Sequence, residues 1–190
     1  MSTGGRVDSL RLRGRHRARP AGRNGAQTIN CDRLSAPKPA VESLSVAVEL
    51  REITRETVRA ICDLKVADEQ RGFVAPNALS IAEAHFVPTH WMRAIYADEE
   101  PAGFLLTHED PAEGAYYLWR FMVDERHQRR GVGRRAMELL LERWRDLGAA
   151  AATLSVVPTN LDAITFYELL GFDRTGEEHG GELVMRLEFE

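Results

Sequence analysis

The segment Gln128-Arg129-Arg130-Gly131-Val132-Gly133 has the residue types and spacing that bind an anion. It follows an apolar run that ends at Val123 and precedes a helical pattern that begins near Gly133. Glycine has no side chain to keep a ligand away, so backbone N–H groups at a helix start can point at a phosphate. The helix dipole and the charges of nearby arginines reinforce this preference. Those arginines are Arg129, Arg130, Arg134 and Arg135.

This segment has three alternative interpretations. A Walker A loop is excluded because no Gly-Lys-Ser/Thr sequence follows. A dinucleotide-binding fingerprint is matched literally by Gly131-x-Gly133-x-x-Ala136, but no Asp or Glu ends the next strand, and the domain is too short for two mononucleotide halves. The third alternative is an ordinary helix N-terminus with a basic first turn.

The segment belongs to a longer pattern. Gln-x-x-Gly-x-Gly after a central strand, followed by Asn160 and by Ala163-x-x-Phe166-Tyr167-x-x-Leu170-Gly171-Phe172, resembles the GNAT superfamily of N-acetyltransferases. Within that superfamily, the stretches 72–77, 80–84, 93–96 and 119–124 are similar to those of bacterial spermine/spermidine or diamine acetyltransferases. The resemblance runs from about residue 46 to the end of the chain.

The resemblance implies acetyl-coenzyme A as co-substrate and no metal. In the superfamily the sheet splays beside the long strand, and the pantetheine arm inserts there as a pseudo-strand. Backbone groups of Met122 and Val123 are then expected to pair with pantetheine, and the backbone N–H groups of residues 128–133 to hold the diphosphate. Asn160 is expected to cap its helix and to contact the pantetheine arm. The residues expected to bind the cofactor are Met122, Val123, Gln128, Arg129, Arg130, Gly131, Val132, Gly133, Arg134 and Asn160.

Acetyl transfer to an amine requires proton removal, because an alkyl amine with a pKa near ~10.4 is mostly protonated at neutral pH. The departing thiolate is helped by a hydrogen-bond donor, and a phenol can serve. Tyr167 occupies the superfamily's position for that acid, so the resemblance implies this role. The alternative is that Tyr167 only fills the core.

The general base is not identified by the sequence. Several related enzymes carry a Glu near the position of Trp119 or Arg120, and this chain departs from that pattern. Glu83 is the first candidate for amine binding or proton relay, with an exposed helix carboxylate as the alternative. Weaker candidates are Asp124, Glu69 and His127.

Arg120 stands in an otherwise apolar strand, so an acidic partner is expected for it, although the sequence does not say which residue this is. Several aromatic residues are candidates for an amine pocket through cation–π contacts, or alternatively for core positions. They are Trp91, Tyr96, Tyr116, Tyr117 and Trp119.

The elements that must position these residues follow from hydrophobic periodicity and from turn residues. Strands are expected at 46–51, 93–97, 102–106, 116–123 and 153–157, and a closing hairpin at 172–174 and 182–189. Helices are expected from 54, at 80–86, at 133–147 and at 160–170, with Thr54 and Asn160 as caps and Met137, Leu140, Leu141 and Trp144 as a buried stripe. This order predicts an α+β fold with one mixed, mostly antiparallel sheet.

Composition separates the chain into two parts. Residues 1–40 hold nine Lys and Arg against two Asp and Glu, and the remainder holds 16 against 27. Residues 1–44 are expected to be a disordered basic extension: a basic arm, a targeting peptide, a solvated tail or translation from an upstream start. Residues 45–190 are expected to form the acetyltransferase domain. Its acidity favours cationic small molecules over nucleic acid.

No apolar run reaches the roughly 18 residues of a membrane span, and the N-terminus lacks the apolar core of a secretory signal. Cys31 and Cys62 have no metal-ligand spacing, which fits the cytoplasm. The expected function is acetylation of a primary amine, a polyamine or diamine such as spermidine or spermine, by a homodimer. Alternatives are an aminoglycoside-like antibiotic, an amino acid or a protein N-terminus as acceptor, a non-catalytic acetyl-coenzyme A-binding module, and a dehydrogenase.

Overall fold

A computed structural model describes residues 46–190, and the extension predicted at 1–44 lies outside this range. The described chain forms one seven-stranded sheet with the strand order β1-β2-β3-β4-β5-β7-β6. All neighbouring strands are antiparallel except β4 and β5, which are parallel. The strands are β1 (Val48–Arg51), β2 (His90–Ala97), β3 (Glu100–Asp110), β4 (Ala115–Val123), β5 (Ala151–Val156), β6 (Asp173–His179) and β7 (Glu182–Glu188). The predicted element order and fold class are confirmed.

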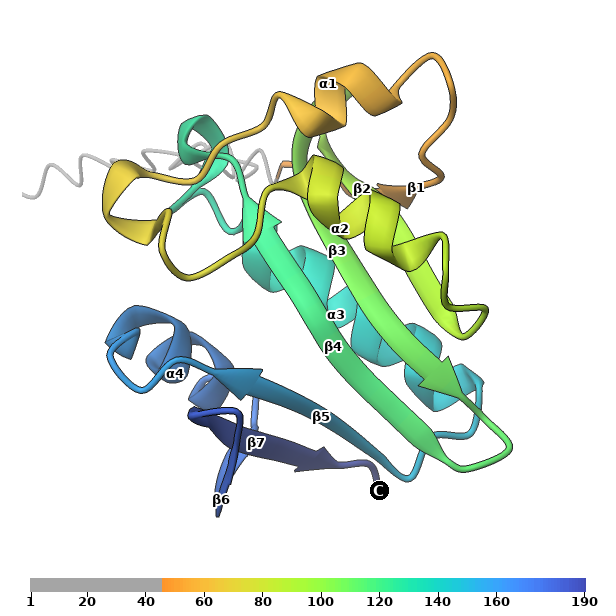
Figure 1. Ribbon diagram of the computed structural model, residues 1–190, viewed down its shortest axis with the longest axis vertical. Coiled ribbons are helices and arrows are strands. Elements are labelled where there is room, and N and C mark those ends of the chain that lie inside the picture. The colour runs from red at the N-terminus through yellow and green to blue at the C-terminus, as the bar shows by residue number, and fades with distance from the viewer. Residues whose placement is uncertain (1–45) are drawn as a thin grey trace, which may run out of the picture. The chain divides into compact units, whose positions relative to one another are not determined.

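Helices cover both faces of the sheet (Figure 1). In that view α1 (Val58–Cys62) and α2 (Asn77–Ala84) lie in front of β2 and β3, and α3 (Val132–Asp146) lies behind. The helix α4 (Leu161–Glu168) lies beside β5 and β7, and short 3-10 turns occur at Asp68–Gln70 and Glu125–His127. The stripe predicted for α3 is confirmed, since all four of its members are buried.

The side chains of the central strands alternate between two cores, as the pleat of a strand requires. On β3, Leu105 joins the core against α3, while Phe104 and Leu106 join the core against α1 and α2. On β2, Ile95 and Ala94 divide in the same way. This double burial explains why these strands are nearly continuous apolar runs in the sequence.

A β-bulge in β4 sets the geometry of the site. Leu106 pairs with Arg120 and Thr107 pairs with Leu118, so Trp119 is the extra residue. A bulged strand bends and its local twist increases. The pairing of β4 with β5 ends at Leu118↔Leu154, directly before the bulge, and the two strands diverge beyond that point (Figure 1).

Several predicted boundaries differ from the observed ones. The helix expected from Thr54 begins at Val58, and its N-cap position is held by Thr57 and not by Thr54 as predicted. Residues 55–57 form a turn instead, in which Thr54 Oγ1 accepts a hydrogen bond from the Glu56 N–H. The helix expected at Ser80 begins at Asn77, directly after Pro76. The turn expected over 98–101 contains only Asp98 and Glu99. Both have positive φ values, of 47° and 70°, as a two-residue hairpin turn requires.

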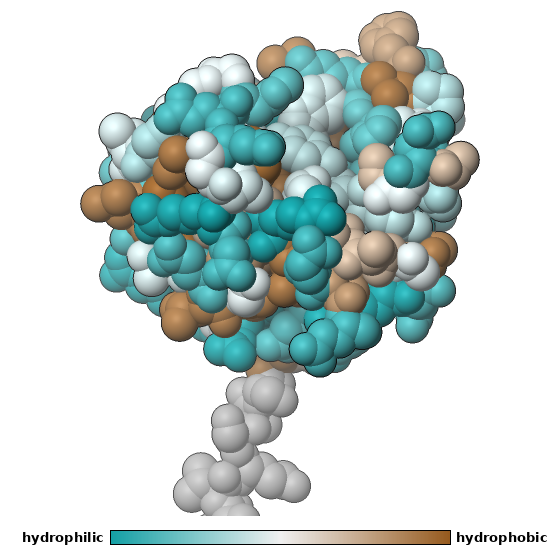
Figure 2. Space-filling view, turned by 90° about the horizontal axis from the view of Figure 1, so that it is seen from below, coloured by the Kyte–Doolittle hydropathy of each residue, from teal (hydrophilic) through white to brown (hydrophobic). Residues whose placement is uncertain are grey.

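The surface is mostly polar where Figure 2 shows it: hydrophobic residues form small patches between hydrophilic side chains. None of the helices within residues 46–190 has the length and apolar character needed to cross a bilayer.

Candidate active site

The divergence of β4 and β5 opens a cleft of about 740 Å³. One wall is β4 from Leu118 to Val123, and the opposite wall is the end of β5 with the first turns of α4. The loop 72–75 and the start of α3 complete the lining. The cleft therefore lies where the sequence resemblance predicts insertion of the pantetheine arm.

One end of the cleft carries unpaired backbone N–H groups. The N-cap of α3 is Gly131, and the helix's first backbone bond runs from Arg135 N to Gly131 O at 3.0 Å. The N–H groups of residues 131–134 therefore have no partner within the helix. Arg129 and Gly131 have φ values of 58° and 80°, and alternating left-handed residues of this kind turn successive N–H groups into an anion-binding nest.

Gly133 and Gly103 allow close packing around β4. A Cβ at Gly133 would lie 3.4 Å from Val123 Cγ2 across the cleft lining. A Cβ at Gly103 would lie 2.5 Å from the carbonyl oxygen of Met122, which therefore faces β3. Strand alternation then directs the backbone groups of Val123 to the open side.

The side chain of Gln128 fixes the end of β4. Its Nε2 donates to Val123 O at 2.9 Å and to Gln70 Oε1 at 2.7 Å, so it joins the strand end to the loop before α2. Asp124 makes a second connection to this loop, since its Oδ2 accepts from Lys65 N at 3.0 Å. The loop that forms one rim of the cleft is therefore attached to β4 by side chains.

Most of the residues expected to bind the cofactor meet at the cleft. Those that line it are Met122, Val123, Gln128, Arg129, Gly131, Gly133, Arg134 and Asn160. The side chain of Val132 is instead buried in the core, and Arg130 Nη1 lies 3.3 Å from His127 Nδ1. Asn160 caps α4 as expected, because its Oδ1 accepts from Ala163 N at 3.2 Å.

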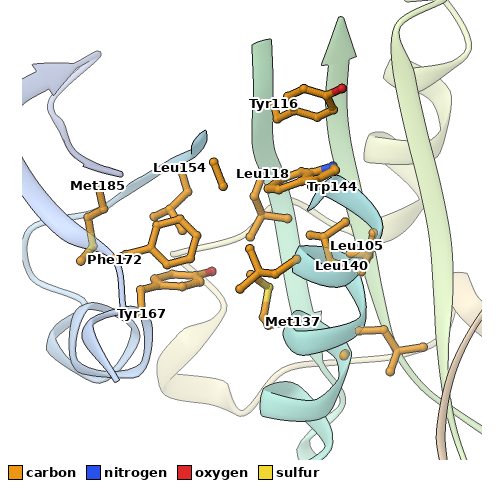
Figure 3. Close-up of a cluster of buried hydrophobic side chains, with 14 of the residues drawn as sticks. Leu105, Tyr116, Leu118, Met137, Leu140, Trp144, Leu154, Tyr167, Phe172 and Met185 are labelled. Atoms are coloured by element: carbon orange, nitrogen blue, oxygen red, sulfur yellow. The ribbon is translucent and has the colours of Figure 1, made fainter. Parts of the chain in front are cut away.

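Tyr167 on α4 lines the cleft, with only 8% of its surface exposed. Its ring packs against Phe166 and Phe172, at centroid distances of 5.2 Å and 5.9 Å, and extends from α4 towards the β4 side in Figure 3. Burial, with a smaller contribution from Tyr117, raises the pKa of the phenol above its usual value. Tyr167 therefore stays protonated at neutral pH and can donate a proton to an atom in the cleft.

The acidic partner of Arg120 is Glu83, a pairing that the sequence did not identify. Arg120 Nη2 lies 3.8 Å from Glu83 Oε2 on α2, and the guanidinium stacks on the Trp119 ring at 4.5 Å. The bulge turns Trp119 and Arg120 to the same face, that of α2. Arg120 lines the cleft, whereas Glu83 is not among the lining residues within 46–190.

His90 completes this group, since its ring lies 4.7 Å from that of Trp119. Burial lowers the pKa of His90, His108 lowers it further, and Glu83 opposes the shift. His90 is therefore uncharged at neutral pH. Three buried polar atoms of this group have no hydrogen-bond partner among the described residues: Glu83 Oε2, His90 Nδ1 and Arg120 Nε.

The weaker candidates for a base lie away from the cleft lining. Asp124 is buried, which would raise its pKa, but hydrogen bonds from Arg126 and Lys65 outweigh burial and lower it. His127 is also buried, 3.8 Å from Glu100, and Glu69 is exposed.

The aromatic candidates for an amine pocket divide between the cleft and other positions. Only Trp119 lines the cleft among the five. The Trp91 ring packs under Arg143 and Tyr96 under Arg51, at 4.2 Å and 4.5 Å. Tyr116 is buried and donates to Leu147 O.

Sequence reasoning missed a hydrogen-bonded group on the second wall. Ser155 and Glu182 line the cleft, and Ser155 Oγ donates to Glu182 Oε2. The hydroxyl of Tyr117 lies 2.7 Å from the same Oγ. Only the placement of Glu182 at the start of the last predicted strand hinted at this group, because its partners are 27 and 65 positions distant in the chain.

No group of three or more His, Cys, Asp and Glu side chains is arranged to hold a metal ion within residues 46–190. The N–H nest, the open edge of β4 and the volume of the cleft fit the diphosphate and pantetheine of acetyl-coenzyme A as co-substrate.

Comparison with known proteins agrees with this geometry. Residues 48–172 match the model of the acetyltransferase (GNAT) family, and the chain belongs to this family. It is 26% identical over 148 residues to the spermine/spermidine N(1)-acetyltransferase of Bacillus subtilis, covering 74% of this chain and 97% of that protein.

Two further relatives show the range of the family. The [ribosomal protein bS18]-alanine N-acetyltransferase of Salmonella typhimurium is 32% identical over 100 residues, covering 48% of this chain and 66% of that protein. The PaiA N-acetyltransferase of Thermoplasma acidophilum, solved with coenzyme A, has a TM-score of 0.60 at 14% identity, covering 75% and 99% of the two chains. The fold is therefore that of the GNAT acetyltransferases.

Proposed function

We propose that this acetyltransferase acetylates a primary amine, and that its acceptor is a polyamine or diamine such as spermidine or spermine. The observation that carries the proposal is that one cleft is lined both by the N–H nest at Gly131 and by the buried phenol of Tyr167. The similarity to a spermine/spermidine acetyltransferase extends over 97% of that protein and supports the choice of acceptor. The acidic excess after residue 40 favours a cation as well.

Acetyl-coenzyme A supplies the acetyl thioester. The N–H groups of residues 131–134 hold the diphosphate, with charge from Arg129 and Arg134. Backbone groups of Val123 pair with the pantetheine arm, next to Met122. Gln128 keeps the strand end in place, and Asn160 contacts the same arm while capping α4.

Tyr167 donates its proton to the departing sulfur. Its burial keeps the phenol neutral until the sulfur develops charge, so the proton is available at physiological pH. Glu83 acts on the acceptor side by holding Arg120 against Trp119, which shapes the wall that the amine meets. We further propose a homodimer that works in the cytoplasm.

An amine panel tests the proposed function. Thiol release from acetyl-coenzyme A is measured with spermine, spermidine, short diamines, an aminoglycoside, free amino acids and a peptide that begins with alanine. The proposal predicts the highest kcat/KM for a polyamine or diamine. Preference for the peptide would instead support the second candidate, a protein N-terminus, to which the similarity with the alanine N-acetyltransferase points.

A further inference from the structure

Carboxylate side chains form part of the lining of the cleft. Two acidic residues are among those that line the cleft within 46–190: Asp162 and Glu182. Asp162 is exposed in the first turn of α4, near the cap residue Asn160. Glu182 is partly buried at the first residue of β7, on the same side of the cleft as Tyr167.

The hydrogen bonds around Glu182 have a defined direction. A serine hydroxyl has one proton, and Ser155 Oγ uses it for Glu182 Oε2. The phenol of Tyr117 must therefore donate to Ser155 Oγ at 2.7 Å. The carboxylate therefore accepts from a chain of two hydroxyl groups, and it retains lone pairs for a further donor such as an ammonium group.

The hydrogen-bonded side chains of Tyr117, Ser155 and Glu182 lie where β4 and β5 stop pairing. Tyr117 and Leu118 are the two residues of β4 that pair with β5, and Ser155 is the first β5 residue after the last pair, Leu118↔Leu154. Tyr167 belongs to the same buried cluster as Leu118 and Leu154, the last pair between these strands. The proton donor and the carboxylate therefore line the same cleft.

We propose that Glu182 binds the ammonium group of the acceptor and removes its proton, with Ser155 and Tyr117 as positioning residues. This inference rests on the proposed function. One ammonium proton passes to the carboxylate, and the neutral nitrogen forms a C–N bond with the thioester carbon. The C–S bond breaks with its electron pair on sulfur, and the phenol of Tyr167 protonates that sulfur. The acetylated nitrogen then passes its excess proton to the phenolate of Tyr167, which restores the phenol. Glu182 releases its proton to water.

The assignment explains how the chain can function without a carboxylate at Trp119 or Arg120. An ammonium group that leaves water requires a compensating charge, and Glu182 supplies one inside the cleft. Glu83 is less suited to this role because it pairs with Arg120 and is not among the described residues that line the cleft.

The test compares Glu182→Gln with two matched variants, Glu178→Gln on the exposed strand β6 of the same hairpin and Glu83→Gln on α2. Glu182→Gln is expected to lower kcat/KM for spermidine by about 10²–10⁴-fold, with unchanged acetyl-coenzyme A affinity. Glu178→Gln is expected to stay within about twofold of the parent, as for an exposed residue away from the site. A Glu182→Gln enzyme that retained parental kcat/KM would overturn the inference.

Chemical rescue separates proton removal from a merely structural role. Added formate is expected to restore turnover of Glu182→Ala at least tenfold, because a small carboxylate can enter the space left by the side chain. Loss of turnover without rescue, in a variant that melts like the parent, would show that Glu182 only holds Ser155 and Tyr117 in place.

A binding measurement does not depend on turnover. Calorimetry of putrescine with the protein alone is expected to show binding that Glu182→Gln weakens at least tenfold; equal affinity would contradict the inference. If the parent protein acetylated no amine in the panel, the proposed function itself would fail. If it did so while Glu182→Gln remained fully active, only the inference would fail.

Discussion

Leu118 and Leu154 form the last backbone pair between β4 and β5, and β4 bulges at the next residue. Because a bulge bends its strand, the sheet opens on the side of the N–H nest while it stays closed on the side of the loop before β4. The cleft is therefore a consequence of how one strand pairs, and Tyr167 and Glu182 are among the residues that line it.

Gly131 and Gly148 offer a matched test of the N–H nest. Their φ values are 80° and 79°, and neither has an atom within 4 Å of an added Cβ. Alanine at either position is expected to cost about 1–2 kcal/mol in the free energy of unfolding. Only Gly131→Ala is expected to weaken acetyl-coenzyme A binding, at least tenfold, in calorimetric titration. Equal affinities for the two variants would contradict a nest at Gly131.

Gly103 is required for the packing of β3 against β4. An added Cβ would lie 2.5 Å from a backbone oxygen, that of Met122, and 3.0 Å from Ile95 Cδ1. Gly103→Ala is expected to lower the free energy of unfolding by about 1–3 kcal/mol in urea. Gly72→Ala is the control, because an added Cβ there meets nothing within 4 Å. A Gly103→Ala variant as stable as Gly72→Ala would show that the strands can separate without cost.

The Glu83–Arg120 pair is accessible to a double-mutant cycle. The side chains are 38% and 23% exposed and 3.8 Å apart, so solvent screens their attraction. The cycle with Glu83→Gln and Arg120→Leu is expected to give a coupling energy of about 0.5–1 kcal/mol in urea unfolding. Strictly additive effects would indicate that the pair does not hold Arg120 in position.

The buried phenol of Tyr167 predicts a pH dependence of stability. An unfolded tyrosine ionises near ~10, whereas the folded pKa of Tyr167 is higher. Above about pH 10 the unfolded chain releases a proton that the folded protein keeps, so stability falls as pH rises. The stability difference between the parent and Tyr167→Phe is expected to shift against the parent between about pH 9 and 11, by at most ~1.4 kcal/mol per unit. A constant difference in urea unfolding would contradict the raised pKa.

The parts of the fold that were predictable depend on local chemistry. The stripe on α3, the capping of α4 by Asn160 and the glycine-rich start of α3 are all encoded within a few residues. The spacing of these residues locates the nest. The family resemblance is needed to single out Tyr167. The order of elements follows from the same local signals.

The remaining features depend on residues that are distant in sequence. The partner of Arg120 lies on α2, and the partners of Glu182 lie on β5 and β4. The bulge at Trp119 depends on the register with β3, which period-2 alternation does not specify. These long-range contacts involve both carboxylates that we propose to act on the acceptor, and this explains why the sequence did not identify a base.

The central claim is that the cleft transfers acetyl groups, with Tyr167 as the proton donor to sulfur. The most direct test is thiol release with spermidine by the parent and by Tyr167→Phe, together with acetyl-coenzyme A affinity by calorimetry. We predict that kcat falls by about 10²–10⁴-fold while the affinity changes by less than about twofold. Unchanged kcat in Tyr167→Phe would remove the phenol from the mechanism and contradict the account.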